Sequence, residues 1–132
     1  MIFPATTAFY AGLLALVYLG LSGWVIGTRV SENVLFGDGG ADTVLKRVRS
    51  HANFSEYVPL ALIVIGLLEA SGGSHGLVRA LLITLLVARI LHPIGMFAPP
   101  NSPRQFACRG GGILLTMAAL AVAAIALLVR VA

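Results

Sequence analysis

Charged side chains are scarce in this sequence. Asp, Glu, Lys and Arg make up only 11% of its 132 residues, whereas soluble domains carry about 25% charged residues. Hydrophobic residues make up 58% of the chain, and the mean hydropathy is +0.96. This balance excludes an ordinary soluble globular domain and predicts an integral membrane protein.

Cysteine is nearly absent as well, since Cys108 stands alone. A single cysteine excludes an intramolecular disulfide and any metal site built from several thiolates. No second His, Cys or carboxylate lies at metal-ligand spacing from His92, so we expect no bound metal. The first basic residue is Arg29, so the positively charged start of a secretory signal peptide is missing. We therefore expect the first apolar run to be a retained membrane span.

The net charge of +4 and the pI near 10 would indicate nucleic-acid binding in a soluble protein. In this chain, however, the basic residues cluster at the ends of apolar segments. That distribution is typical of membrane topology signals and of an anionic ligand. We therefore expect no nucleic-acid partner.

Four apolar segments divide the sequence, at about residues 3–28, 42–70, 76–97 and 104–130. Each is long enough to cross a hydrocarbon layer of about 30 Å. The short connection at residues 71–74 makes the second and third segments antiparallel neighbours. The prediction is a single all-α domain over residues 1–132, an integral membrane four-helix bundle that runs up-down-up-down. We expect its last helix to loosen at the glycine run of residues 110–112.

Basic residues are unevenly divided between the two ends of this bundle. Two residues, Arg79 and Arg130, belong to the end that holds both termini. Six belong to the other end, with its first and third loops: Arg29, Lys46, Arg47, Arg49, Arg104 and Arg109. The excess of positive charge predicts that these two loops are cytoplasmic.

A polar stretch at residues 47–59 interrupts the apolar character of the second segment. At 100° per residue, Arg49, Asn53 and Glu56 share one side of a helix, whereas Arg47 and His51 point the opposite way. Such a helix cannot face lipid in its first turns, so other protein or water must cover it. An ionisable residue inside a span is a candidate functional residue by default.

Several polar residues of the later segments are expected near the same end of the bundle. Together with the second segment, the candidates are Arg49, Glu56, Arg89, His92, Arg104 and Arg109. A structural ion pair between Glu56 and Arg49 or Arg89 explains part of this set equally well. The arginines outnumber the nearby glutamate, however, and guanidinium groups match carboxylate or thiolate ligands. The excess therefore indicates a cavity for an anionic ligand.

The polar stretch resembles the signature of the MAPEG family, the membrane-associated proteins in eicosanoid and glutathione metabolism. The family pattern on helix two, Arg-x-x-x-Asn-x-x-Glu-(Tyr)-x-Pro, is matched by Arg49, Asn53, Glu56, Tyr57 and Pro59. The four-span plan, an Ala-Arg-x-x-His segment ending at His92 and an arginine that opens helix four extend the similarity over nearly the whole chain. The sequence most resembles the small bacterial branch of the family.

The resemblance implies a homotrimer in a bacterial inner membrane, with glutathione bound at each subunit boundary near the cytoplasmic face. Carried over by motif, the glutathione-binding residues are Arg49, Asn53, Glu56, Tyr57, Arg89 and His92. Arg104 takes the thiolate-stabilising role, contributed by or facing the neighbouring subunit, with Arg109 as the runner-up. The implied function is a membrane-bound glutathione transferase, or a related peroxidase. Such an enzyme joins the glutathione thiolate to hydrophobic electrophiles or lipids that enter from the bilayer.

Helix three departs from the eicosanoid-processing members, which carry tyrosines where this chain has His92 and Met96. That difference argues against leukotriene or prostaglandin chemistry and leaves the electrophile open. Turnover itself is also open, because a non-catalytic glutathione- or lipid-binding protein of the same fold is the alternative. A proton-coupled transporter that uses Glu56 and His92 is a weaker hypothesis, since the first and last spans lack polar residues to line a path.

Overall fold

The computed structural model describes residues 2–132, and nearly all of this range is helical. The first three spans are α1 (Ala5–Ser31), α2 (Asp42–Ala70) and α3 (His75–Met96). The last span consists of three consecutive segments: α4 (Pro103–Gln105), a π-helical turn η1 (Phe106–Gly110) and α5 (Gly111–Val131). The predicted helix ends agree within two residues except at the end of α1, which continues to Ser31.

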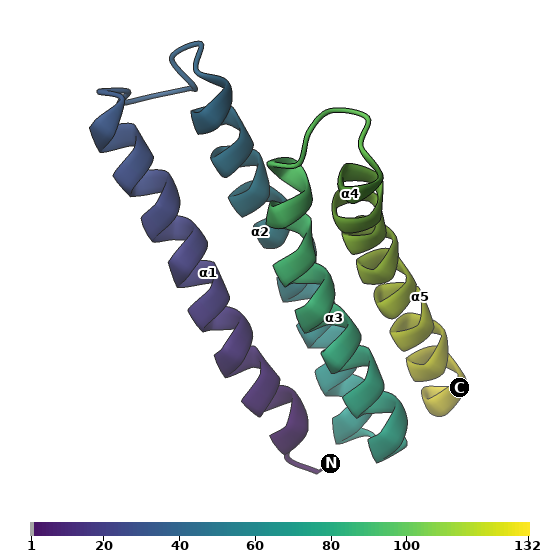
Figure 1. Ribbon diagram of the computed structural model, residues 1–132. Helices are drawn as coiled ribbons and strands as arrows, with labels where there is room; N and C mark the ends of the chain where they lie inside the picture. The colour runs from purple at the N-terminus through teal and green to yellow at the C-terminus, as the bar shows by residue number, and fades with distance from the viewer. Residues whose placement is uncertain (1) are drawn as a thin grey trace.

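Within residues 2–132, four helical stretches are long and apolar enough to cross a membrane. They run alternately up and down, so both termini lie at one end of the molecule (Figure 1). We call this end the terminal pole; it also holds the turn at residues 71–74. The opposite end, the loop pole, holds the connections at residues 32–41 and 97–102. The predicted membrane four-helix bundle is confirmed.

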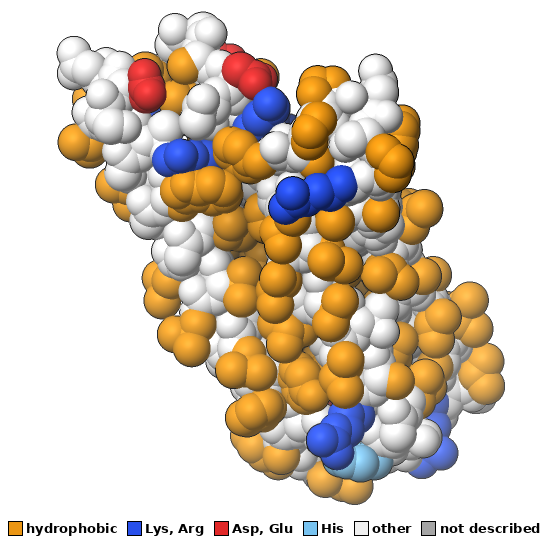
Figure 2. Space-filling view, in the orientation of Figure 1, with side chains coloured by type: hydrophobic (Ala, Val, Ile, Leu, Met, Phe, Trp, Pro, Cys, Tyr) orange, Lys and Arg blue, Asp and Glu red, His pale blue; other side chains and the backbone are white. Residues whose placement is uncertain are grey.

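The helices are arranged so that α2 and α3 form the centre. Each of them packs against the other and against both outer spans, α1 and α5, whereas within the described residues 2–132 no Cα atom of α1 lies within 8 Å of a Cα atom of α5. Leu14, Phe54, Ile65, Leu82 and Leu85 are buried in the core between these helices. Large apolar side chains also cover the outer surface (Figure 2), as expected for a surface that faces lipid.

The helix ends are set by left-handed residues at the C-termini of α1 and α2 and by a side-chain cap at the start of α4. The helix α1 ends before Asn33, which has a φ of 54°. At the end of α2, Gly72 has a φ of 82°, and its N–H donates to the Glu69 carbonyl. This left-handed glycine closes the helix as a C-terminal cap. The helix α4 opens with Pro103, and the Ser102 side chain accepts a hydrogen bond from Gln105 N at 3.1 Å, a standard N-cap.

A carboxylate holds the start of α1 against the end of α2. The Glu69 side chain accepts hydrogen bonds from the backbone nitrogens of Thr6 at 2.9 Å and Thr7 at 2.8 Å, and from the Thr7 hydroxyl at 2.7 Å. These backbone N–H groups have no partner inside α1, because the first turn of a helix leaves them free. Glu69 is therefore fully engaged in joining the two spans at the terminal pole.

Two glycines allow α3 and the last span to come into backbone contact. A Cβ atom added at Gly95 would overlap the Arg109 backbone nitrogen and lie 2.7 Å from Arg109 Cα. A Cβ atom at Gly112 would lie 2.9 Å from the Ala88 carbonyl oxygen. The predicted loosening of the last helix is present as η1, which begins at Phe106 and shares only its last residue, Gly110, with the expected run at residues 110–112. The π-helical turn sits against α3 at Gly95.

We predict that Gly95→Ala destabilises the protein, because the added methyl group meets backbone that cannot rotate away. Overpacking of this kind typically costs about 1–3 kcal/mol. Thermal unfolding of the detergent-purified protein measures the effect. Gly20→Ala is the matched control, since a Cβ there meets nothing within 4 Å and alanine is the better helix former. Equal stability of the two variants would contradict the close contact.

Candidate functional site

The polar stretch of α2 presents two faces, as its helical phase predicts. Arg47 and His51 face α1: the Arg47 guanidinium lies 4.7 Å from the centre of the Trp24 ring, and its Nη1 donates to the Thr28 hydroxyl. His51 Nε2 lies 3.0 Å from Ser22 Oγ. These side chains join α1 to α2, so they take no part in the candidate site on the other face.

A small pocket of about 130 Å³ opens on the face that carries Arg49 and Asn53. The residues that line it come from four elements: Arg49 and Asn53 from α2, His92 and Met96 from α3, Arg109 from η1 and Ile113 from α5. The pocket therefore brings together Arg49, Asn53 and His92 of the predicted glutathione-binding set, along with Arg109. We call it the loop-pole pocket.

Arg89 lies behind the loop-pole pocket rather than in its wall, since only 2% of its surface is exposed. From α3, its Nη1 donates to Asn53 Oδ1 at 2.6 Å, and its Nη2 donates to the Gly112 carbonyl at 2.9 Å. The Thr116 hydroxyl donates to the same carbonyl at 2.8 Å. One guanidinium group thus ties α3 to α2 and to α5.

The Arg89 contact also orients the amide of Asn53. A guanidinium group can only donate hydrogen bonds, so the Asn53 oxygen must face Arg89 and the amide NH₂ is directed away from it. The other polar groups of the pocket wall are the guanidinium groups of Arg49 and Arg109 and the ring of His92. A wall rich in donors suits a ligand with carboxylate, carbonyl or thiolate acceptors.

Arg49 and Glu56 lie on the open side of the site. Arg49 Nη1 is 3.8 Å from Glu56 Oε1, and the two side chains are 55% and 49% exposed. The predicted ion pair therefore forms with Arg49, while Arg89 instead binds Asn53. Charged groups in a membrane-spanning helix face protein or a water-filled cavity, because lipid cannot solvate them. One chain alone leaves this surface uncovered.

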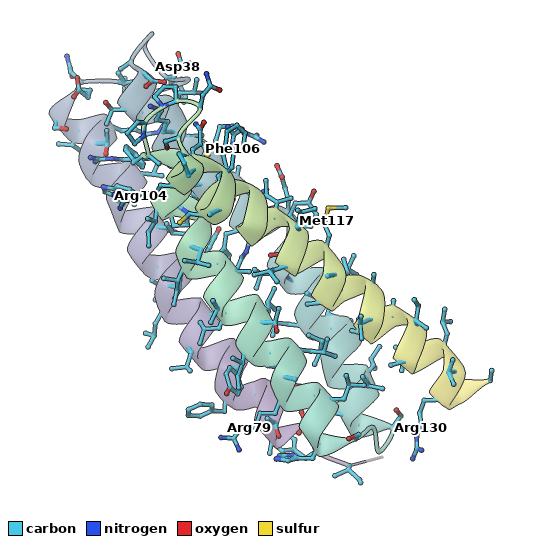
Figure 3. The ribbon with its side chains drawn as sticks, turned by 45° about the vertical axis from the view of Figure 1, so that its right-hand side comes forward. Asp38, Arg79, Arg104, Phe106, Met117 and Arg130 are labelled. Atoms are coloured by element: carbon cyan, nitrogen blue, oxygen red, sulfur yellow. The ribbon has the colours of Figure 1, made fainter. Side chains whose placement is uncertain are left out.

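The remaining predicted site residues lie apart from the loop-pole pocket. Tyr57 is partly buried and does not line it. Arg104 is exposed on α4 at the loop pole (Figure 3) and does not line it either. Of the two candidates for the thiolate-stabilising role, Arg109 is the one in the pocket of its own chain. The preference for Arg104 stays a prediction, since it requires Arg104 to reach a neighbouring subunit.

Sequence reasoning missed three features of the site. These features are Ile113 in the wall of the loop-pole pocket, the hydrogen bond from Arg89 to Asn53, and the close backbone contact at Gly95. The backbone of η1 reaches α3 only because Gly95 lacks a side chain, and this contact sets the position of Arg109. A glycine inside an apolar span, opposite the glycine run at residues 110–112, was the available signal for close helix packing.

Comparisons with known proteins identify the same family that the sequence motif on α2 resembles. The model of the MAPEG family matches residues 7–129. The chain belongs to the MAPEG family. This MAPEG protein is 32% identical over 114 residues to the inner membrane protein YecN of Escherichia coli K12. The matched region covers 86% of this chain and 83% of the relative. YecN of a second strain, E. coli O6:H1, matches to the same extent. No solved structure gives a significant match.

We predict that Arg89→Gln lowers the stability of this MAPEG protein by about 3 kcal/mol. The substitution removes two charge-assisted hydrogen bonds, each worth about 1.5–3 kcal/mol, while glutamine restores at most part of one. Thermal unfolding in detergent is the measurement, with Arg79→Gln as a control because Arg79 is exposed on the same helix. If the two variants unfold at the same temperature, Arg89 does not hold the helices together.

Proposed function

We propose that this protein is a membrane-bound glutathione transferase that conjugates the glutathione thiolate to hydrophobic electrophiles. The observation that carries the proposal is the donor-rich wall of the loop-pole pocket, with Arg49, Asn53 and Arg109 around one opening. Glutathione is an anionic tripeptide with carboxylates, amide carbonyls and a thiol. Its acceptor groups complement this wall, and membership of the MAPEG family supports the same ligand.

The chemistry requires a thiolate, because the thiol itself is a poor nucleophile. A free thiol has a pKa near about 8.5, and a neighbouring guanidinium group lowers it by stabilising the anion. In the proposed reaction, thiolate sulfur attacks the electrophilic carbon and the leaving group departs with its electron pair. Of the two candidates for this role, Arg109 lines the pocket of its own chain, whereas Arg104 would be supplied by a neighbouring subunit.

The proposed active form is a homotrimer with sites at its subunit boundaries. Ligand pockets commonly measure about 300–1,000 Å³, whereas the loop-pole pocket of one chain is about 130 Å³. A tripeptide would therefore extend beyond it, over the exposed Arg49 and Glu56. A second subunit packed on this face would complete the pocket and cover charges that lipid cannot solvate.

The proposed location is a bacterial inner membrane, supported by the four membrane-spanning helices within residues 2–132 and by the printed name of the YecN relatives. With six basic residues at the loop pole against two at the terminal pole, the loop pole would be cytoplasmic. That orientation would place the pocket where glutathione is abundant and reduced. Substrates soluble in the bilayer would reach the pocket from the side.

A conjugation assay tests the proposal. Detergent-purified protein is incubated with glutathione and 1-chloro-2,4-dinitrobenzene, and formation of the thioether is followed by absorbance. We expect saturable turnover that Arg109→Gln lowers about a hundredfold, since loss of one group that stabilises a developing anion costs about 10²–10³ in rate. Arg79→Gln, a change of equal charge at the terminal pole, leaves the rate unchanged.

Arg104→Gln separates the two assignments in the same assay. Loss of turnover confined to Arg109→Gln is the expected result, because only Arg109 lines the pocket. A loss confined to Arg104→Gln would give the role to the neighbouring subunit. Saturable binding of glutathione without turnover in the wild-type protein would contradict the transferase proposal. It would favour the alternative, a non-catalytic glutathione- or lipid-binding protein of the same fold.

Glu56→Gln tests the proposed subunit boundary. The substitution keeps the size of the side chain but removes the charge that faces Arg49. We expect weaker glutathione binding by calorimetry, or a trimer that dissociates at lower detergent concentration, because an uncompensated arginine then remains at the interface. Unchanged binding together with an unchanged assembly mass in light scattering would show that helix two lies outside the glutathione site.

A further inference from the structure

The terminal pole carries two adjoining apolar hollows that the proposed glutathione chemistry does not use. One, of about 680 Å³, lies between the end of α2 and the end of α5. The other, of about 710 Å³, lies between the start of α1 and the last turns of α2. Ile2, Leu67 and Ala70 line both, so the hollows meet along α2. Together they form what we call the terminal groove.

Arg130 is the one charged side chain in the wall of the terminal groove as described for residues 2–132. Its Nε donates to the Ser71 carbonyl at 3.1 Å. A Cβ atom at Gly72 would lie 2.9 Å from Arg130 Nη2, so glycine at this turn lets the guanidinium group lie against the backbone. The guanidinium is thus held at the mouth of the groove, at the level where the helices end.

No acidic side chain neutralises Arg130 in the part of the chain that the structure describes, where the ion pairs join Lys46 to Asp42 and Arg49 to Glu56. Glu69 is close in sequence to Ser71, but its carboxylate is engaged by the first turn of α1. Arg79 lies at the same pole as Arg130 (Figure 3), and basic side chains gather at this end in Figure 2. The terminal pole therefore presents positive charge beside an apolar groove.

We propose that the terminal groove binds a phospholipid with a net anionic head group. The lipid phosphate pairs with the Arg130 guanidinium, whose planar fork of donors matches phosphate oxygens. An acyl chain lies along Leu67 and the neighbouring apolar wall. The helix ends put Arg130 at the membrane–water interface, the depth of lipid phosphates. Positive charge favours an anionic lipid over a zwitterionic one with the same chains, since each basic residue near the surface contributes attraction.

Native mass spectrometry of the delipidated full-length protein tests this site. Phosphatidylglycerol and phosphatidylcholine with identical acyl chains are titrated separately, and the bound fraction gives each dissociation constant. We expect phosphatidylglycerol to bind about fivefold tighter or more, the factor that one interfacial basic residue supplies. Arg130→Gln removes this preference. Arg79→Gln is the matched control, because it removes the same charge from the same pole but not from the groove, and it retains most of the preference.

Leu67→Trp tests the acyl-chain part of the proposal, since Leu67 lines both hollows and is 48% exposed. The larger ring fills the groove, so both lipids should bind at least about fivefold more weakly while Arg130 remains. If Arg130→Gln and Arg79→Gln lose the preference for phosphatidylglycerol equally, the preference arises from diffuse surface charge, and the proposed site is wrong. Equal affinity of the wild-type protein for the two lipids, or no lipid bound because a second copy covers the groove, would overturn it as well.

Discussion

The buried guanidinium group of Arg89 is the interaction on which the arrangement of this protein depends. From the second half of α3 it donates to an amide oxygen on α2 and to the carbonyl of Gly112, the last glycine of the run in the last span. Inside a membrane there is no water to replace either partner, so both hydrogen bonds must be made within the protein. The position of Asn53 and the position of the last span are thereby set by the same group. The candidate site lies directly over this contact.

The exposed charged residues of the candidate site follow the opposite rule. Arg49, Glu56 and Arg109 are left open to the outside of a single chain, although they belong to helices that cross a membrane. A buried cation that donates to neutral partners and an exposed group of charges serve different purposes. The first holds the bundle together, and the second requires something else to bind to it. The proposed ligand and the proposed neighbouring subunit would together meet that requirement.

Much of the fold follows from the sequence, because a lipid environment permits few solutions. Four long apolar runs dictate four helices, and short connections dictate antiparallel neighbours. Helical phase alone also separated Arg47 and His51, which face α1, from Arg49 and Asn53, which line the pocket. Helical phase is sufficient for this separation because the side of a helix on which a residue lies depends only on the spacing of residues within that helix.

The parts of the site that depend on contact between helices were not predictable in this way. Spacing along the chain favours Arg104 at the start of the last span, and that preference stays a prediction; in one chain, η1 and the close approach at Gly95 bring Arg109 to the pocket. Likewise, charge alone allows Arg89 to pair with Glu56, whereas packing directs it to Asn53. A backbone contact between two helices sets which of the two arginines lines the pocket of one chain, and the periodicity within either helix does not predict that contact.

Our main proposal is that the donor-rich loop-pole pocket binds glutathione and stabilises its thiolate. Its most direct test is equilibrium binding of glutathione to the detergent-purified wild-type protein, with the ultraviolet absorbance of the thiolate recorded across pH. We expect saturable binding and thiolate visible below about pH 8, under the ordinary thiol pKa of about 8.5. Absence of saturable binding, or a bound thiol that ionises no more readily than free glutathione, would contradict it.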